Sequence, residues 1–272
     1  MTLCSVIVLT YNTCDLTLQC LEQFAEDALL AGWQVLLVDN ASTDGTITEV
    51  AAQFPQVEII AAGQNLGFAG GNNLGITHAR GEFVFLLNSD VLVRQAALAY
   101  LASYLASNPA VGAISPRLLT SRGQPQAFAF GGDPSIIYLL QRGGRRLLGL
   151  GPLHDWAIDH PITVDWVSGA CLGARRTTIE QVGALDASYF LYFEDNDWCL
   201  RMRAAGWQIV YNPTVSAVHL GGQSQPGQAT SDAHYRKSLR RFYDKHYGVL
   251  KRSLLDASLW GYAQILQLRS AI

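Results

Sequence analysis

Short, mostly hydrophobic runs alternate with stretches of helical periodicity along the first third of the chain. The runs occupy residues 4–9, 34–38, 57–60 and 83–87. Runs of this length predict strands that are buried on both faces of a sheet. Between the first two runs, apolar residues recur at helical spacing at Leu16, Cys20, Phe24 and Ala28. This alternation predicts an α/β fold with a mostly parallel, Rossmann-like sheet flanked by helices.

Polar side chains follow three of these predicted strands at the point where each ends. They are Thr10 and Asn12, then Asp39 and Asn40, then Asn88, Ser89 and Asp90. Parallel strands bring their carboxyl ends to one edge of a sheet, where open α/β folds bind nucleotides. Asp90 offers a carboxylate there that can hold a divalent cation together with phosphates. The competing interpretation of residues 88–90 is a turn that caps the next helix.

Neither common phosphate-binding fingerprint is present in the sequence. It contains no G-x-x-x-x-G-K-[ST] motif, and no G-x-G-x-x-G follows the first strand. A P-loop NTPase or a dinucleotide enzyme is therefore not expected. If phosphates bind at this edge, a metal ion at Asp90 has to supply much of the positive charge.

The second half of the chain is predicted to return to regular structure after an irregular insertion. We expect helices at residues 95–108 and 177–182, and strands at residues 111–114, 165–172, 207–211 and 214–218. Residues 119–162 are expected to be irregular and carry the basic residues Arg142, Arg145 and Arg146. Such a segment is either a binding loop or lid, or a solvated insertion.

An aromatic run at residues 189–193 leads into Glu194, Asp195 and Asp197, which open a helix that ends near Gly206. Acids in the first turn of a helix oppose its dipole, and one acid suffices for that. Three acids directly after an aromatic wall indicate a function, and one of them can act as a general base toward a hydroxyl. The pattern alone does not rank the three.

His219 ends the last predicted strand and precedes Gly221 and Gly222. A single histidine is more often a structural hydrogen-bonding residue than a ligand. Because Asp90 otherwise lacks a protein partner for a metal, His219 is a candidate second ligand, and an imidazole slightly favours Mn²⁺ over Mg²⁺.

Two helices are predicted to end the chain, a basic one at residues 229–247 and one with a wide apolar face at residues 249–268. The apolar face has three alternatives: packing on the body, forming a homodimer, or lying in a membrane interface beside the basic helix.

Composition narrows the class of protein without naming a ligand. The chain has 272 residues, of which 49% are hydrophobic and 15% charged, and a net charge of −3, so neither disorder nor nucleic-acid binding is expected. Its five cysteines are scattered, which is typical of buried thiols in a reducing compartment, most simply the cytoplasm. No apolar run is long enough to span a bilayer, and no signal peptide is expected.

Several motifs, in order along the chain, resemble those of one enzyme family. They are Val8-Leu9-Thr10-Tyr11-Asn12, the stretch from Val38 to Thr46, Asn65-Leu66-Gly67-Phe68, Gly71-Asn72-Asn73, Asn88-Ser89-Asp90, Trp166-Val167-Ser168-Gly169-Ala170, Glu194-Asp195 and His219. Over roughly residues 4–222, the chain resembles the inverting family 2 glycosyltransferases of GT-A fold, in particular the rhamnosyltransferase-like branch that builds bacterial surface polysaccharides.

The resemblance implies roles for individual residues. It implies donor binding by Thr10, Tyr11, Asn12, Asp39, Asn40, Asn65, Gly67, Asn72, Asn88, Ser89 and Asp90. It implies acceptor binding by Trp166, Gly169, Ala170 and Glu194, and Mg²⁺ or Mn²⁺ held by Asp90 and His219. Asp195, with Glu194, is the implied catalytic pair, in which Asp195 deprotonates the acceptor hydroxyl. One departure is Asn88, which stands where the family's D-x-D motif has its first acid.

The function implied is transfer of rhamnose from dTDP-rhamnose to a hydroxyl of a glycan or lipid-linked glycan, with location in the cytoplasm or on the inner face of the membrane. The alternatives are a UDP-hexose-dependent transferase of the same fold and a non-catalytic partner module. The expected division is a nucleotide-sugar half at residues 1–110, an acceptor half at 111–228 and a helical extension at 229–272. A sugar-nucleotide pyrophosphorylase is disfavoured because Thr10-Tyr11-Asn12 is not a glycine-rich loop.

Overall fold

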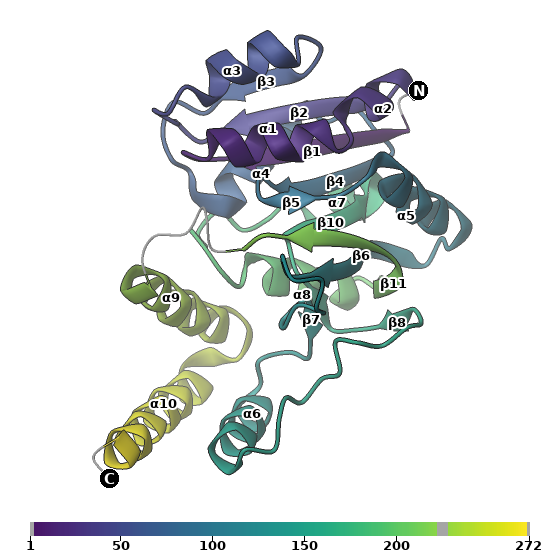
Figure 1. The fold of residues 1–272 in the computed structure, drawn as a ribbon. Helices are drawn as coiled ribbons and strands as arrows, with labels where there is room; N and C mark the ends of the chain where they lie inside the picture. The colour runs from purple at the N-terminus through teal and green to yellow at the C-terminus, as the bar shows by residue number, and fades with distance from the viewer. Residues whose placement is uncertain (1–2, 222–227, 271–272) are drawn as a thin grey trace.

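The computed structural model describes residues 3–221 and 228–270. A twisted central sheet has the strand order β3-β2-β1-β4-β10-β6-β11-β5, with β8 beside β11 (Figure 1). Helices cover it, and α6, α9 and α10 extend from the end of the body that lies farthest from β3 (Figure 1). The α/β class predicted from the sequence is confirmed.

The first half of the sheet is parallel, as expected. Its strands are β1 (Cys4–Thr10), β2 (Gln34–Asp39), β3 (Glu58–Ala61) and β4 (Phe83–Asn88). The connecting helices are α1 (Cys14–Glu22), α2 (Ala25–Leu30), α3 (Thr46–Gln53) and α4 (Gly67–His78). The region predicted as one helix around Leu16 to Ala28 is therefore two helices. Phe24 lies at the break between the two helices, and its ring is buried there, with only 1% of the residue exposed.

The second half of the sheet is mixed. Its elements are β5 (Val91–Leu92), α5 (Gln95–Ser107), β6 (Val111–Leu119), β8 (Ile162–Thr163), β10 (Cys171–Arg175), α7 (Arg176–Val182) and β11 (Gln208–His219). Strand β10 inserts antiparallel between β4 and β6, whereas β6 and β11 are parallel. The two strands predicted at residues 207–218 form the single strand β11, which contains an irregularity between Asn212 and Ser216.

The strand predicted at residues 165–172 is two strands separated by a turn. Strand β9 (Trp166–Val167) pairs with β7 (Phe130–Gly131), and β10 begins only at Cys171. The turn between them is held by a contact with α8, because Gly169 N–H donates to a carboxylate oxygen of Asp195. This tertiary contact overrides the apolar pattern that suggested a continuous strand.

The insertion expected to be irregular contains helix α6 (Ile136–Leu148). Ser135 caps this helix by accepting a hydrogen bond from Tyr138 N–H, 3.2 Å away. The pair Gly143 and Gly144 obscured the helix in the sequence, although apolar and basic residues segregate to opposite faces of it. The helices α8 (Glu194–Ala204), α9 (Gln228–His246) and α10 (Gly248–Ser270) match those expected, and Gly222 lies outside the described residues.

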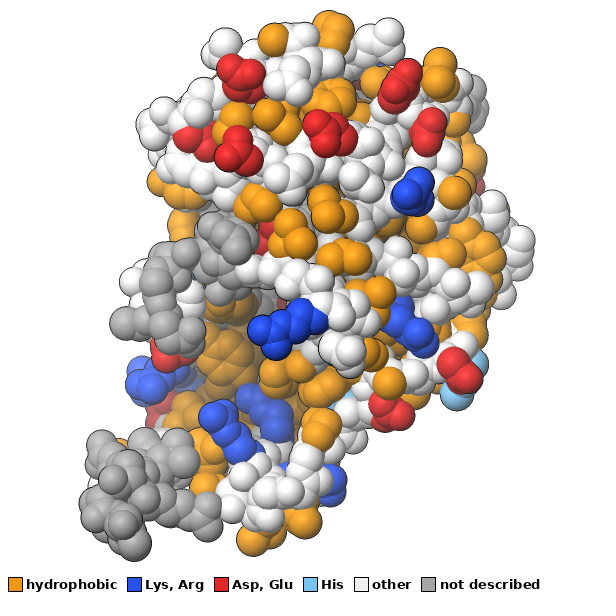
Figure 2. All heavy atoms as spheres, in the orientation of Figure 1, with side chains coloured by type: hydrophobic (Ala, Val, Ile, Leu, Met, Phe, Trp, Pro, Cys, Tyr) orange, Lys and Arg blue, Asp and Glu red, His pale blue; other side chains and the backbone are white. Residues whose placement is uncertain are grey.

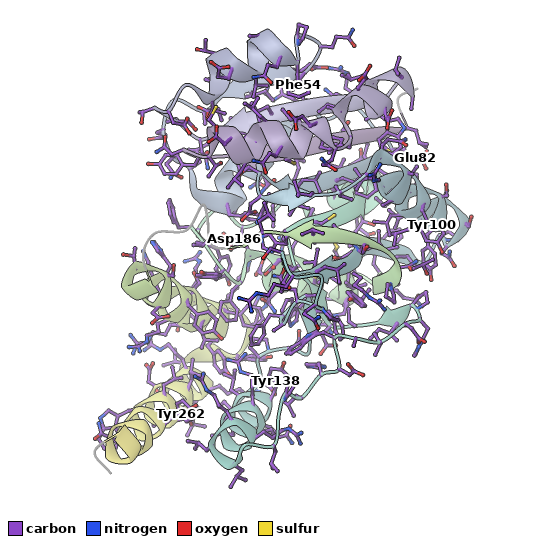
Figure 3. The ribbon with its side chains drawn as sticks, viewed as in Figure 1. Phe54, Glu82, Tyr100, Tyr138, Asp186 and Tyr262 are labelled. Atoms are coloured by element: carbon purple, nitrogen blue, oxygen red, sulfur yellow. The ribbon has the colours of Figure 1, made fainter. Side chains whose placement is uncertain are left out.

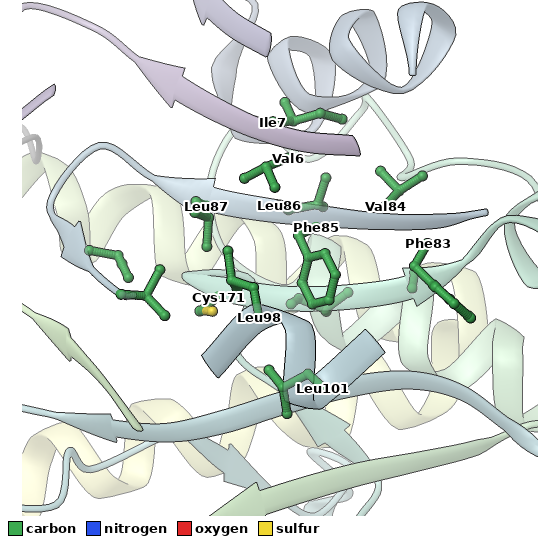
Figure 4. Close-up of a cluster of buried hydrophobic side chains, with 14 of the residues drawn as sticks. Val6, Ile7, Phe83, Val84, Phe85, Leu86, Leu87, Leu98, Leu101 and Cys171 are labelled. Carbon is green, nitrogen blue, oxygen red and sulfur yellow. The ribbon is translucent and has the colours of Figure 1, made fainter. Parts of the chain in front are cut away.

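The main core surrounds strand β4, whose residues 83–87 are each at most 1% exposed (Figure 4). Phe85 packs on Gly173 of β10, where an added Cβ would lie 2.5 Å from the ring. A second apolar cluster joins the terminal helices to the segment before α8. It comprises Tyr189, Phe193, Leu239, Phe242, Tyr243 and Leu255. The terminal helices therefore pack on the body at this cluster, and the division of the chain into three parts stays a prediction.

Candidate active site

The ends of β1 and β2 meet at one edge of the sheet. Asp39 is 1% exposed, its Oδ2 accepts from Ser42 N–H at 3.0 Å, and its Oδ1 has no hydrogen-bond partner within the described residues. Thr10 is buried, and its hydroxyl lies 2.8 Å from that of Thr17, so this contact joins the end of β1 to α1. Asn12 and Tyr11 are exposed beside it. A buried carboxylate oxygen that accepts no hydrogen bond from the protein is a candidate to accept one from a bound ligand.

Asn40 connects this edge to the segment that opens α4. Its Nδ2 donates to the carbonyl of Gly67 at 3.0 Å, and Asn65 Oδ1 accepts from Gly67 N–H at 2.9 Å. Asn72 Nδ2 donates to the carbonyl of Phe68 at 3.0 Å, while its buried Oδ1 has no partner in the part of the chain that the structure describes. Residues that three separate motifs predict for donor binding therefore lie in one hydrogen-bonded group.

The end of β4 presents Asp90 to His219. Oδ1 of Asp90 lies 3.2 Å from Nε2 of His219, and Nδ1 of His219 lies 3.0 Å from Oε1 of Gln126. Ser89 bonds through its hydroxyl to that of Thr13 at 2.8 Å. Residues 88–90 do not cap a helix: the two-residue strand β5 follows, and α5 begins only at Gln95. The alternative interpretation of this step as a helix cap is wrong.

A divalent metal fits Asp90 and His219 only with help from outside the protein. With Gln126 Oε1 accepting the Nδ1 proton, the lone pair of His219 Nε2 faces a carboxylate oxygen that is buried and accepts no hydrogen bond from the described residues. Two facing lone pairs favour a cation between them. Residues 3–221 and 228–270 contain no group of three or more His, Cys, Asp or Glu side chains suited to a metal, so the other ligands have to come from donor phosphates or water.

Asp195 and Glu194 open α8 in different environments. Asp195 accepts hydrogen bonds from Gly169 N–H at 3.0 Å and Asn196 N–H at 2.8 Å, and burial raises its pKa. Glu194 is 5% exposed, and burial, followed by the neighbouring Asp195 charge, raises its pKa well above the ordinary value. The pair follows Tyr192 and Phe193, both at φ 68°, a costly conformation for such side chains that is typical of functional sites.

Asp197, the third acid of the run, is occupied by ion pairs. Its carboxylate lies 2.9 Å from Nε of Arg201, 2.7 Å from Nζ of Lys245 and 2.7 Å from Nε2 of His246. Its side chain is completely buried. These contacts anchor α9 to α8 and leave Asp197 unsuited to accept a proton from a substrate. The structure therefore distinguishes Asp197 from Glu194 and Asp195, which the sequence pattern alone could not do.

Trp166, predicted to bind the acceptor, lies beside Asn196 of the acidic run. Its Nε1 donates to the carbonyl of Gly132 at 3.0 Å. With its amide turned to donate to Oδ1 of Asp195 at 3.2 Å, Asn196 also accepts from Trp166 Nε1 at 3.0 Å. Asn196 and Gln126 are supporting residues that the sequence reasoning missed. Asn196 lay within the acidic run, whereas Gln126 carried no signal in its irregular segment.

Comparison with known proteins identifies the family of the chain. The model of the family described as glycosyl transferase family 2 matches residues 5–129. The chain is 31% identical over 262 residues to N-acetylglucosaminyl-diphospho-decaprenol L-rhamnosyltransferase of Mycobacterium tuberculosis, covering 87% of this chain and 81% of that protein. It is 27% identical over 191 residues to a low-salt glycan biosynthesis hexosyltransferase of Haloferax volcanii, covering 68% of this chain and 58% of that one.

Solved structures share the fold. A mannosyltransferase from Pyrobaculum calidifontis, in complex with GDP-Man and Mn²⁺, superposes with a TM-score of 0.57 at 20% identity, covering 98% of this chain and 79% of that one. The family match and the mycobacterial relative carry the assignment, and the structural likeness supports the GT-A fold. The chain belongs to glycosyl transferase family 2.

Proposed function

We propose that this chain is an inverting transferase that moves rhamnose from dTDP-rhamnose to a hydroxyl of a lipid-linked glycan. The observation that carries the proposal is one turn shared by both halves of the site. Ala170 accepts a hydrogen bond from Asn88 N–H at 3.0 Å, and the adjacent Gly169 donates to Asp195 at 3.0 Å. The end of β4 and the proposed base are therefore held in register through two consecutive residues.

On the donor side, the proposal assigns the base to Asp39 and the diphosphate to the end of β4. Asp39 Oδ1 and Asn72 Oδ1 have no hydrogen-bond partner among the described residues and can accept hydrogen bonds from a nucleotide-sugar. Thr10, Tyr11, Asn12, Asn40, Asn65, Gly67, Asn88 and Ser89 shape the same edge. Asp90 and His219 would hold Mn²⁺ or Mg²⁺, which when bound supplies positive charge to the leaving diphosphate.

On the acceptor side, Asp195 takes the proton of the acceptor hydroxyl, and the oxygen attacks the anomeric carbon from the face opposite the diphosphate. Its raised pKa makes it a stronger base than an exposed aspartate. Glu194, adjacent to Asp195, orients the acceptor; burial raises the pKa of its carboxyl. Trp166, Gly169 and Ala170 line the side from which the acceptor approaches.

The donor sugar and the lipid-linked acceptor are supported by the name of the mycobacterial relative. The test is a panel of dTDP-rhamnose, UDP-glucose and UDP-galactose with a lipid-linked acceptor, with the anomeric configuration of the product read by NMR. Transfer from dTDP-rhamnose with inversion is expected. Preference for a UDP-hexose would select the alternative donor, and neither transfer nor hydrolysis from any donor would select the non-catalytic partner module.

The proposal includes a cytoplasmic location with peripheral contact to the inner face of the membrane. Among the described residues, no helix is long and apolar enough to cross a bilayer. Val249, Leu250, Leu254 and Trp260 of α10 are each 58–83% exposed, and Lys251 is exposed beside them. Sedimentation with anionic vesicles tests the contact, and a homodimer on size exclusion without vesicle binding would assign this face to a second copy.

A further inference from the structure

We propose that the groove between α6 and α10 binds the hydrocarbon chain of the lipid that carries the acceptor sugar, an isoprenoid with a diphosphate head. This inference rests on the proposed function and deepens it by naming where the acceptor lipid lies. The groove is separate from the residues proposed to bind the donor and from the turn at Gly169 that contacts Asp195. Three observations carry it: the apolar lining, the charge at that lining and the contact with the segment before Glu194.

The groove is large and predominantly apolar. Its volume is about 920 Å³, and its walls come from α6, α9, α10 and residues near Phe128 and His154. Leu139, Leu147, Leu255 and Leu259 line it. Figure 2 shows hydrophobic side chains in the hollow with Lys and Arg side chains beside it, and Figure 3 labels Tyr138 of α6 and Tyr262 of α10. Pockets of about 300–1,000 Å³ hold small organic ligands.

The charge of the lining complements an anionic head group. Arg142 and Arg146 contribute to the lining, and no Asp or Glu among the described residues does. Neither guanidinium pairs with a carboxylate within residues 3–221 and 228–270; that of Arg142 donates to the Tyr235 hydroxyl at 3.1 Å. Arg145, between them, instead donates to the carbonyl of Gly151 at 3.2 Å and does not line the groove. An apolar chain joined to phosphates matches this combination.

The groove also adjoins the catalytic segment. Tyr235 lines it and packs its ring 5.1 Å from that of Phe193 and 6.0 Å from that of Tyr192. Phe193 directly precedes Glu194. A lipid chain in the groove would therefore have its head end available to Arg142 and Tyr235, on the side of the aromatic wall that supports the acidic pair.

The groove is distinct from the surface proposed to meet the membrane. Val249, Leu250, Leu254 and Trp260 of α10, the residues proposed to meet the membrane, are each 58–83% exposed and do not line the groove. A flat bilayer surface can contact these outward side chains, whereas a concave apolar channel between two helices suits a single chain. We therefore assign the groove to one lipid chain rather than to the bilayer.

Two serines of α10 provide a matched test. Ser258 lines the groove and donates to the carbonyl of Leu254 at 2.8 Å. Ser253 makes the same type of bond to Val249 at 3.1 Å but is exposed and does not line the groove. The variants Ser258→Phe and Ser253→Phe add the same ring at the same kind of helical position. Arg146→Gln and Arg145→Gln form the equivalent pair for charge.

The measurement is calorimetric titration of the full chain, without nucleotide, with geranylgeranyl diphosphate below its micelle concentration. We expect binding by the wild type and by Ser253→Phe, at least about tenfold weaker binding by Ser258→Phe, and weakening by Arg146→Gln but not Arg145→Gln. Equal affinity of the two serine variants, equal binding of inorganic pyrophosphate alone, or no binding by the wild type would overturn the proposal. Thermal melts of all four variants show whether each is folded.

The outcome is separable from that of the proposed function. If the prenyl lipid does not bind but dTDP does and sugar transfers to a short water-soluble acceptor, only the assignment of the groove fails. If the lipid binds as expected but no nucleotide does, the groove stands and the transferase proposal fails. Self-association that masks the groove at micromolar concentration would assign it to a second copy and overturn the lipid proposal.

Discussion

Oδ1 of Asp90 lies 3.2 Å from Nε2 of His219, with 4% and 13% of the two side chains exposed. Strand β5 and the end of β11 bring them together, since His219 pairs with Val91 across the sheet. Gln126 accepts from the other ring nitrogen at 3.0 Å, which orients the imidazole. The single acid left in the Asn88-Ser89-Asp90 motif thus gains a nitrogen partner from the far end of the domain.

Removing either member of this pair should abolish metal-dependent nucleotide binding. Asp90→Asn and His219→Ala each remove one of the two proposed protein ligands, and Gln126→Ala should weaken Mn²⁺ affinity by about 10–100-fold because it releases the imidazole ring of His219. The measurement is dTDP titration with and without Mn²⁺. His78→Gln, at the far end of α4, is the matched histidine control and should behave as wild type. Unchanged Mn²⁺ dependence in Asp90→Asn would refute the assignment.

Substitution of two aspartates of α8 should change different properties, the transfer rate for Asp195 and the stability for Asp197. Asp195→Asn should lower the transfer rate by about 10²–10⁴-fold with dTDP affinity near wild type, because it removes the proposed base but none of the residues proposed to bind the donor. Asp197→Asn should instead lower stability by about 3–5 kcal/mol, because buried Asp197 holds Arg201, Lys245 and His246. Single-turnover transfer and thermal melts distinguish them. Loss of dTDP binding in Asp195→Asn would mean that Asp195 belongs to the donor site.

Glu194 should give the fold a pH dependence of definite sign. Its pKa is raised in the folded protein, so the folded state holds the proton more tightly than the unfolded state does. The stability it contributes is complete below the unfolded pKa and is lost as pH rises through the raised folded pKa. Melting temperatures from pH 5 to 9 should therefore fall less steeply for Glu194→Gln than for wild type. Parallel curves would contradict the raised pKa.

Gly67 should tolerate no side chain, whereas Gly63 should tolerate alanine at moderate cost. Both have φ +72°, so alanine costs about 1–2 kcal/mol at either position. At Gly67 the new Cβ also lies 2.7 Å from the ring of Phe190, and it would disturb the bond from Phe68 N–H to Phe190 O at 2.8 Å. Gly67→Ala should melt lower than Gly63→Ala and bind dTDP more weakly. Equal effects would show that the Phe190 contact is unimportant.

The strands of the first half of the sheet could be predicted because the pattern that indicates them is local in the sequence. The apolar runs that became β1, β2 and β4 are buried on both faces, and the polar steps after them follow from parallel topology. The prediction failed where distant contacts decide. Gly169 is held out of a strand by Asp195, and β10 enters antiparallel because a later segment fills the gap between β4 and β6.

The site was harder to predict than the fold because the role of each side chain there depends on residues that are distant in the sequence. Glu194, Asp195 and Asp197 look equivalent along the sequence, yet only Asp197 is neutralised by cations from α8 and α9. Helix α6 was missed because two glycines interrupt its pattern. Gln126 could not be recognised, since its role depends on the arrival of His219 from β11.

The most direct test of the account is calorimetric titration of the wild-type chain with dTDP, UDP and GDP, each with and without Mn²⁺ or Mg²⁺. We expect dTDP to bind, and to bind more tightly with metal. Metal-dependent binding of UDP but not dTDP would replace the donor while keeping the mechanism, and tight binding that ignores metal would remove Asp90 and His219 as ligands. Absence of binding by every nucleotide would contradict the transferase account and favour a non-catalytic partner module.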